Sequence, residues 1–294
     1  MQKRNLFFTI LIHAVFILCA ITFVVPMLYV ISISFSSESA LNLYGYQLFP
    51  KEWSLSAYQS VLKNPTQLIN SYKVTIFSSL FGSALSVLVM GLMAYPLSRS
   101  NFYFKRPMTF LIFFTMLFGG GLIPSYILNT QYIGIGNTIW IYIFPGLASA
   151  WYIIIMRTFF QQLPPSLVES AKIDGASEYR IFYTIILPLS KPVLATVFLM
   201  VMLAKWNDWY TTLIYVRDAK LYTLQYMLQR ILREILLINS MDSMIGDASG
   251  ADKYMIGESV KYATIIVATL PILFIYPFIQ KYFVKGVMIG AVKE

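Results

Sequence analysis

The hydrophobic residues of this chain occur in long continuous runs, separated by shorter polar connections. Continuous runs argue against β-strands, which would alternate apolar and polar residues, and about 20 apolar residues suffice for a helix that crosses a bilayer. The pattern predicts six transmembrane helices, at residues 6–33, 74–97, 108–128, 138–160, 193–216 and 262–279. We therefore expect an all-α, polytopic membrane protein that forms one membrane domain over residues 1–294.

The first run has the position of a signal peptide but not its properties. It is longer than the apolar core of about 7–15 residues that signal peptides have, and no small-x-small cleavage site closes it. Leu18 before Cys19 also argues against a lipoprotein cleavage site. We expect a retained first transmembrane helix.

The composition indicates a membrane protein that lacks the residues for catalysis or metal binding. Hydrophobic residues make up 58% of the chain and charged residues 12%, against about 25% charged in soluble domains. A single cysteine, Cys19, and a single histidine, His13, leave no disulfide and no cysteine- or histidine-based metal site. The sequence has neither a G-x-x-x-x-G-K-[S/T] phosphate loop nor an H-E-x-x-H metal motif. We therefore predict no catalytic residue, no metal and no cofactor in this chain.

The basic residues predict the orientation. With six spans, one side carries twelve basic and four acidic residues, including both termini and the polar loop at residues 163–190. The opposite side, including the connection at residues 217–261, carries nine basic and eight acidic residues. By the positive-inside rule the first side is cytoplasmic, and the net charge of +9 reflects topology rather than nucleic-acid binding. Within residues 217–261 we expect a helix at 221–238 followed by a mobile, glycine-containing loop.

The 163–190 loop is a charged island between two apolar spans. Pro164 and Pro165 can begin a helix, and Gly175 can end it in a left-handed conformation. Ser177 can cap a second helix, which we expect to stop before Pro188. The loop is thus predicted to form two short helices joined at a glycine, at residues 166–173 and 178–186.

One face of this loop suits a protein partner. Val168, Ala171 and Ala176 form a face of low relief, and Glu169 and Asp174 supply charges for a partner's Arg or Lys. Residue chemistry alone fits an amphipathic connector lying on the bilayer equally well. The pattern predicts a projecting shape without identifying a partner.

The motif in this loop resembles the coupling loop of ABC importer permeases. Glu169, Ala171, Asp174, Gly175 and Ala176 match the pattern E-A-A-x-x-D-G-A, with Ser170 in place of the middle alanine, and the pattern F-x-x-I-x-L-P follows at residues 182–188. Similarity continues in the runs FGGGLIPSY (118–126), IIMRTFF (154–160), KWNDW (205–209) and YFVKGVMIGAVK (282–293). These runs resemble carbohydrate-importer permeases of the maltose-permease-like class, in its oligosaccharide and polysaccharide branch.

The resemblance implies the type I importer fold and a set of partners in a bacterial cell membrane. These are a second homologous permease, two cytoplasmic ATPase subunits that bind ATP and Mg²⁺, an external solute-binding protein or lipoprotein, and membrane lipid. The five motif residues of the 163–190 loop would transmit ATP-driven closure to the membrane helices. The tail at residues 280–294 would contact the ATPase pair, although a basic tail bound to anionic lipid fits its composition as well.

A polar cluster interrupts the fifth span. Trp206, Asn207, Asp208 and Trp209 are candidates for the solute path, because ionisable residues at membrane depth usually face a cavity, and Lys205 and Asp208 are spaced to pair on one helix face. An interfacial position, with the tryptophans as anchors, is the alternative. In span three, the triple glycine 119–121 predicts a helix break, for close packing or for a gate.

The sequence is compatible with three functions to different degrees. A pore-forming subunit of an ATP-driven oligosaccharide importer fits best. A permease for amino acids or phosphate would share the 163–190 loop, but the tryptophans and the FGGGLIPSY run favour a carbohydrate. A secondary transporter is less consistent, since its ionisable residues would be spread over several spans.

Overall fold

The computed structural model describes residues 6–63, 65–245, 257–271 and 273–274. Within these ranges the chain is helical, and the only β-structure is one isolated bridge between Ser36 and Trp53. The chain divides into two compact units, Met1–Pro65 with Leu228–Pro271 and Thr66–Met227 with Ile272–Glu294. The expected tail at residues 280–294 lies outside the described residues.

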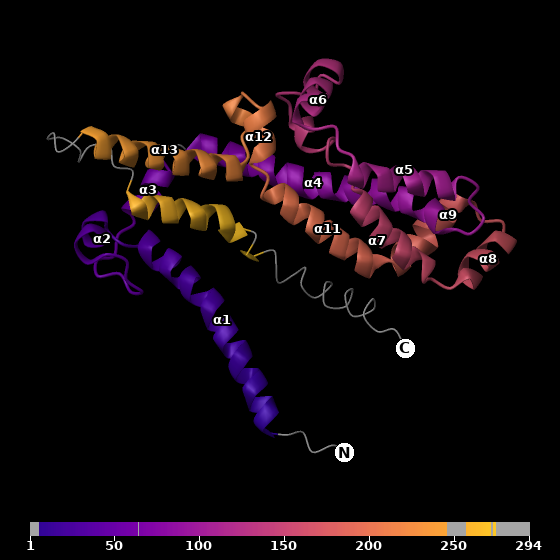
Figure 1. Ribbon diagram of the computed structural model, residues 1–294, viewed down its shortest axis with the longest axis horizontal. Coiled ribbons are helices and arrows are strands. Elements are labelled where there is room, and N and C mark those ends of the chain that lie inside the picture. The colour runs from indigo at the N-terminus through magenta and orange to yellow at the C-terminus, as the bar shows by residue number, and fades with distance from the viewer. Residues whose placement is uncertain (1–5, 64, 246–256, 272, 275–294) are drawn as a thin grey trace. The chain divides into compact units, whose positions relative to one another are not determined.

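The first unit contains the N-terminal helix and two short helices after it. Helix α1 (Leu6–Ser34) exposes almost every side chain, including Phe16 and Phe23. Helices α2 (Glu38–Tyr44) and α3 (Ser56–Val61) follow, and a helix at residues 258–271 packs beside them (Figure 1). Ala57 and Val61 contact Ala263 in a small apolar cluster. The unit thus joins the two ends of the described chain.

A carboxylate links α2 to the helix at residues 258–271. Glu38 accepts hydrogen bonds from the backbone N–H groups of Glu258, at 2.8 Å, and Ser259, at 3.3 Å, and from the Ser259 hydroxyl at 2.8 Å. These are the unpaired donors of a helix N-terminus, where negative charge is stabilised. A Cβ at Gly257 would collide with this carboxylate.

The second unit is organised around helix α4 (Pro65–Ser98). Its 34 residues extend about 51 Å, well beyond the roughly 30 Å hydrocarbon core. One face of α4 is buried and carries seven buried serine and threonine residues, Ser71, Thr75, Ser78, Ser79, Ser83, Ser86 and Ser98. The hydroxyls of Ser78, Ser79 and Ser83 bond to carbonyls of the preceding turn. Small residues let neighbouring helices approach closely in a membrane.

The remaining helices of this unit follow α4 along the chain. They are α5 (Lys105–Leu117), α6 (Leu122–Ile127), α7 (Ala150–Gln161), α8 (Pro165–Ile173), α9 (Glu178–Ile181), α10 (Leu187–Leu189), α11 (Lys191–Trp206) and α12 (Tyr210–Tyr215). Short π-helical turns occupy η1 (Leu128–Tyr132) and η3 (Phe182–Ile186), and 3₁₀ turns occupy η2 (Ile139–Tyr142) and η4 (Ala219–Leu221). The main core joins α4, α7, α11 and the 163–190 loop around Met90, Met156, Phe160, Phe182 and Val197.

Helix α13 (Leu224–Ile245) crosses the division between the two units. It replaces the helix expected at residues 221–238, beginning three residues later and extending seven residues further. The expected mobile loop is therefore shorter at its start, and residues 246–256 lie outside the described ranges.

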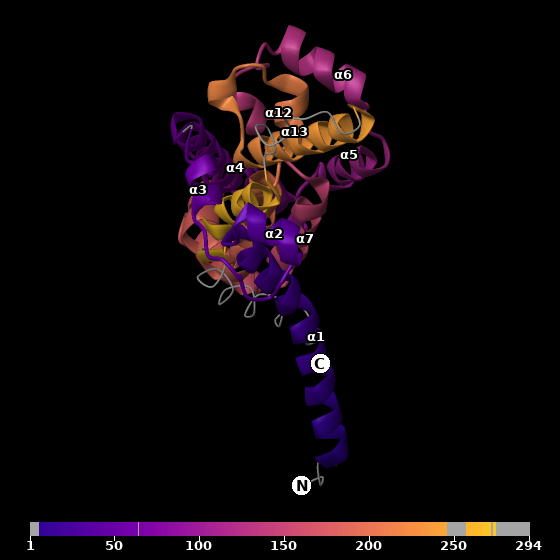
Figure 2. The ribbon, with the colours of Figure 1, turned by 90° about the vertical axis from the view of Figure 1, so that its left-hand side faces the viewer.

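Some of the six expected spans are continuous helices in the structure, and others are bent or interrupted. Among the described residues, α1 and α4 are long and apolar enough to cross a membrane, and two bent helix pairs raise the number to as many as four. One pair joins α5 to residues 122–132 through a bend of 112°, which turns α6 away from α5 (Figure 2). The other joins residues 178–189 to α11 at 81°. The predicted break at the triple glycine is thus confirmed.

The span expected at residues 138–160 is not one continuous helix. A 3₁₀ turn at Ile139–Tyr142 is followed by irregular backbone, and α7 begins only at Ala150. Pro145 and Gly146 lie in the gap, where a proline cannot donate the next helical hydrogen bond. The last expected span, 262–279, is described as helical to residue 271.

Candidate functional sites in the 163–190 loop and around Lys205

The first helix and the glycine turn of the 163–190 loop are as predicted. Helix α8 begins at Pro165, and after Asp174 the chain turns at Gly175, whose φ is +76°. The N–H of Gly175 bonds to the carbonyl of Lys172 at 3.0 Å, and that of Ala176 to the carbonyl of Ala171 at 2.9 Å. This pair of bonds is the Schellman arrangement that closes a helix C-terminus on a left-handed residue.

The second helix begins as predicted but ends later. The Ser177 hydroxyl accepts a hydrogen bond from the N–H of Arg180 at 3.4 Å, and α9 starts at Glu178. The expected stop before Pro188 is wrong, because the helix continues through η3 and α10 to Leu189. The π-helical turn of η3 lies just before the proline, where regular α-helical bonding would lack a donor. The chain bends after Ser190 instead.

The face of low relief in this loop points into the protein, contrary to prediction. Val168 is 6% exposed and Ala171 is 9% exposed, and both belong to the main core, against which Ala176 also packs. An amphipathic helix buries its apolar stripe against the nearest core, and here that core is supplied by α4 and α7. Val168 and Ala171 therefore position the loop against this core, and the partly buried Ala176 packs on it as well.

The opposite face of the loop is exposed. Glu169 and Asp174 lie on it, and neither makes an ion pair or a side-chain hydrogen bond within the part of the chain that the structure describes. Ile173 is 87% exposed and Tyr179 is 75% exposed beside them. These two side chains add apolar surface to the charges on this face. We call these four residues the outer face of the loop.

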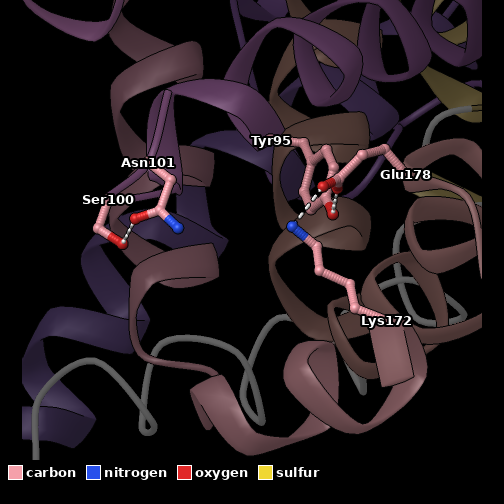
Figure 3. A network of polar contacts seen from close by, with 5 residues as sticks. All are labelled: Tyr95, Ser100, Asn101, Lys172 and Glu178. Atoms are coloured by element: carbon pink, nitrogen blue, oxygen red, sulfur yellow. Dashed lines mark hydrogen bonds and ion pairs between the residues drawn. The ribbon is translucent and has the colours of Figure 1, made fainter. Parts of the chain in front are cut away.

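A polar network fastens the loop to α4 (Figure 3). Tyr95 donates a hydrogen bond to the Glu178 carboxylate at 2.6 Å, and the Lys172 ammonium lies 2.6 Å from the same carboxylate. The guanidinium of Arg99 lies 4.7 Å from the centre of the Tyr95 ring. The Lys172 ammonium, followed by the Tyr95 hydroxyl, lowers the pKa of the Glu178 carboxyl.

This network could not be predicted from the sequence. Tyr95 and Glu178 are 83 residues apart and belong to different elements. Lys172 and Glu178 lie on either side of the glycine turn, so no regular helical spacing brings them together. The only local indication was the concentration of charge in the loop.

The second candidate site is a cavity of about 320 Å³ that contains the Lys205 side chain. Met90, Tyr142, Ser149, Tyr152, Asp208 and Thr211 are among its lining residues. The Lys205 ammonium donates a hydrogen bond to the Tyr142 carbonyl at 2.7 Å, and its stem packs beside Gly82, where a Cβ would lie 3.1 Å from Lys205 Cε. The Tyr142 carbonyl is three residues before Pro145, which has no N–H to offer it. Lys205 therefore satisfies a carbonyl that the broken helix leaves unpaired.

The predicted pairing of Lys205 with Asp208 is not present. Helix α11 ends at Trp206, and Asp208 accepts the N–H of Thr211 at 2.9 Å instead of forming an ion pair with Lys205. Both charged side chains nevertheless line one cavity. The cavity thus holds an ammonium with further donors and a carboxylate with a further acceptor.

The other three residues predicted for the solute path, Trp206, Asn207 and Trp209, have different surroundings. Trp206 is 2% exposed, so its ring is buried in the protein and cannot stack on a solute in this conformation. Asn207 bonds to the Leu203 carbonyl at 2.9 Å and to Gln225 at 3.3 Å. Trp209 is half-buried and packs edge-on against Tyr210. Only Asp208, of the four predicted residues, lines the Lys205 cavity.

Hydroxyl groups hold the wall of this cavity together. The Tyr142 hydroxyl donates to the Leu221 carbonyl at 2.7 Å and lies 2.9 Å from the Thr212 hydroxyl. Thr212 in turn lies 3.0 Å from Thr223, which donates to the Asp208 carbonyl at 2.9 Å. This series of hydroxyl groups could not be predicted from the sequence, because its bonded partners lie up to 79 residues apart.

The triple glycine has no packing partner in the described part of the chain. A Cβ at Gly119 or Gly121 would meet nothing within 4 Å, and one at Gly120 would meet only Pro124, at 3.9 Å. Gly121 has a φ of +82°, so the glycine serves the bend between α5 and α6. Among the described residues, close packing is therefore not its purpose.

Comparison with known proteins agrees with this architecture. Residues 76–289 match the family model described as "Binding-protein-dependent transport system inner membrane component". The chain is 37% identical over 292 residues to the polygalacturonan/rhamnogalacturonan transport system permease protein YtcP of Bacillus subtilis, with 99% of each chain covered. It is 39% identical over 270 residues to protein LplC of Bacillus subtilis, covering 92% of this chain and 89% of that one.

A solved structure shares the fold. It is a bacterial ABC transporter involved in the import of the acidic polysaccharide alginate, with a TM-score of 0.80 and 28% identity, covering 96% of this chain and 99% of that chain. Because the family model covers well over half of the sequence, and the relatives cover nearly all of it, the chain belongs to the family of binding-protein-dependent transport system inner membrane components.

Proposed function

We propose that this chain is a pore-forming permease subunit of an ATP-driven importer, and that its cargo is a carbohydrate. The 163–190 loop is the observation that carries this proposal. Its two helices, joined at Gly175, present an exposed outer face, while its inner face packs on the membrane helices. The family membership and the oligosaccharide and polysaccharide permeases among its relatives support it. The chain itself is a transport component and not an enzyme.

The proposal includes six membrane spans with both termini in the cytoplasm. It is supported by six apolar runs and by the excess of basic residues on the side of the 163–190 loop. Helices α1 and α4 and the two bent pairs supply up to four of these spans within the described residues. The partners in this proposal are a second permease, two ATPase subunits and an external solute-binding protein.

The outer face of the 163–190 loop is proposed to meet the ATPase. Glu169 and Asp174 supply charge and Ile173 and Tyr179 supply apolar contact. Movement of this surface would reach α4 through the Tyr95–Glu178–Lys172 network and through Val168 and Ala171 in the core. A packed core and a fixed polar network transmit displacement as a rigid body, which a coupling element requires.

The Lys205 cavity is the proposed position on the solute path. Its ammonium and carboxylate can bind hydroxyl groups of a sugar, and the ammonium can pair with the carboxylate of an acidic sugar. Acidic polysaccharides are named for two of the similar proteins, the alginate importer and the polygalacturonan permease. We therefore favour an acidic oligosaccharide over a neutral one.

Uptake measurements with the intact transporter test this function. Cells that express the chain together with its partner subunits should accumulate labelled oligogalacturonate, and deletion of the gene for this chain alone should abolish the uptake. Amino acids and phosphate serve as the controls for the alternative solute classes. Loss of amino-acid or phosphate uptake on deletion, with oligosaccharide uptake unchanged, would overturn the assignment.

A further inference from the structure

A further cavity in the second unit is lined by residues that belong to neither candidate site. It has a volume of about 830 Å³ and is lined by α5, by Phe118 just beyond it and by Arg157 of α7. Helices α5 and α7 lie side by side (Figure 1, Figure 2). We propose that this cavity binds one anionic phospholipid, with the phosphate at Lys105, Arg106 and Arg157 and an acyl chain along the phenylalanines of α5.

The charges at one end of the cavity suit an anion. Lys105, Arg106 and Arg157 all line it, no acidic residue does, and none of the three makes an ion pair within the described residues. Arg157 Nε and Thr109 Oγ1 are buried here without a hydrogen-bond partner in the described part of the chain. Clustered cations at a membrane boundary are unfavourable unless a counter-charge is present, and a phosphate supplies both the charge and acceptor oxygens.

The rest of the cavity has the length and chemistry of an acyl chain. Phe110 and Phe114 on α5 and Phe118 just beyond it recur every four residues, with ring centres 6.2 Å apart for the first pair and 4.4 Å for the second. From Phe110 to Phe118 the helical rise is about 12 Å, compared with about 15 Å for one leaflet of the hydrocarbon core. A phospholipid has a charged head group and an apolar acyl chain. The basic residues of the cavity therefore fit the head group, and the phenylalanines fit the acyl chain.

A transmembrane helix is the rival occupant. Helix α1 is an example of an apolar helix long enough to cross a membrane, and it has no acidic residue between Leu6 and Ser34. Such a helix would cover the phenylalanines but would leave the three cations without a counter-charge. The charge distribution in the cavity thus favours a lipid.

The test uses the complete transporter, purified through a tag on this chain and studied by native mass spectrometry with added phosphatidylglycerol or phosphatidylcholine. We expect one tightly bound phosphatidylglycerol per copy of this chain and no comparable phosphatidylcholine. Lys105→Gln combined with Arg157→Gln should weaken phosphatidylglycerol binding about 30-fold, since each basic residue near the lipid surface contributes about a factor of five. Arg180→Gln combined with Lys191→Gln is the matched control, because it removes two exposed charges elsewhere and should leave binding unchanged.

A photocrosslinker decides between the two occupants. Benzoyl-phenylalanine placed at Phe114 in membranes should form adducts with phospholipid. Adducts only with a polypeptide, or equal loss of phosphatidylglycerol in the control variant, would overturn the proposal. Because this readout needs only an assembled complex, it does not depend on which solute is transported.

Discussion

The Tyr95 hydroxyl donates a 2.6 Å hydrogen bond to the Glu178 carboxylate and so joins the end of α4 to the 163–190 loop. Lys172 lies 2.6 Å from the same carboxylate, across the glycine turn. One carboxylate therefore holds a long membrane helix and both short helices of the loop (Figure 3).

Removing the Tyr95 hydroxyl should loosen this connection. We expect Tyr95→Phe to lower stability by about 1 kcal/mol, because the Glu178 side chain is 53% exposed and solvent partly replaces the lost bond. ATP hydrolysis by the purified transporter should become less dependent on solute. The control is Ser100→Ala, which removes an exposed hydrogen bond to Asn101 beside this network. An equal effect of both variants would contradict the role of Tyr95.

The same network should respond to acid. The pKa of the Glu178 carboxyl is lowered in the folded protein by its bond to Lys172 and then by Tyr95, so the charged form is stabilised. The stabilisation is complete above the ordinary value of 4.5 and is lost as pH falls through the lowered folded value. Thermal unfolding of the wild type should therefore be more acid-sensitive below pH 4.5 than that of Glu178→Gln. Identical acid profiles would show that the pair contributes nothing.

Gly175 should be required for its backbone conformation rather than for space. Its φ is +76°, and a Cβ would meet nothing within 4 Å. Gly175→Ala should cost about 1–2 kcal/mol of local strain and uncouple transport from ATP hydrolysis. Gly134→Ala is a matched control, with a φ of +73° and equally open surroundings outside the loop. Membrane insertion, measured by immunoblot of the membrane fraction, should be unchanged in both.

Lys205 should control transport through its ammonium group. Lys205→Met leaves the Tyr142 carbonyl unpaired and removes the positive charge from the cavity, and we expect at least a tenfold loss of acidic-oligosaccharide uptake. Lys205→Arg keeps the charge and a donor and should retain more uptake. Binding of the ATPase to detergent-solubilised complex separates a transport defect from misfolding. Full uptake by Lys205→Met would remove this cavity from the solute path.

The link between Glu38 and the helix at residues 258–271 should stabilise the first unit. Glu38→Gln keeps an acceptor but loses the charge at the helix N-terminus, so we expect a loss of about 0.5–1 kcal/mol. The thermal midpoint of the purified transporter measures this. Glu52→Gln, whose carboxylate accepts bonds from the Ser37 and Ser39 hydroxyls in the same unit, is the comparison and should have the smaller effect.

Local chemistry predicted local structure well. Pro165, Gly175 and Ser177 begin, end and cap the loop helices as their backbone preferences require. The helix expected over residues 193–216 is instead interrupted between Trp206 and Tyr210. Properties that depend on the loop's position could not be predicted. Nothing in the loop indicates that α4 and α7 lie beneath it, so the inward orientation of Val168 and Ala171 was missed.

The same limit applies to the broken span and to Lys205. A run of apolar residues from 138 to 160 indicates membrane depth, but Pro145 and Gly146 decide that the helix is interrupted. The carbonyl freed by that interruption is satisfied by an ammonium 63 residues away. Spacing rules within one helix suggested Asp208 as the partner of Lys205, because they consider only neighbours on that helix.

Cysteine crosslinking across the 163–190 loop tests the central claim most directly. In a Cys19→Ser background, Ile173→Cys, which replaces a side chain that is 87% exposed, should crosslink to an ATPase subunit in the intact transporter. Val168→Cys, which replaces a side chain that is 6% exposed, should not. Crosslinking from Ile173 that depends on the nucleotide state of the ATPase is the predicted result. Absence of any ATPase crosslink from Ile173 or Tyr179, in complexes where the ATPase co-purifies, would contradict the account.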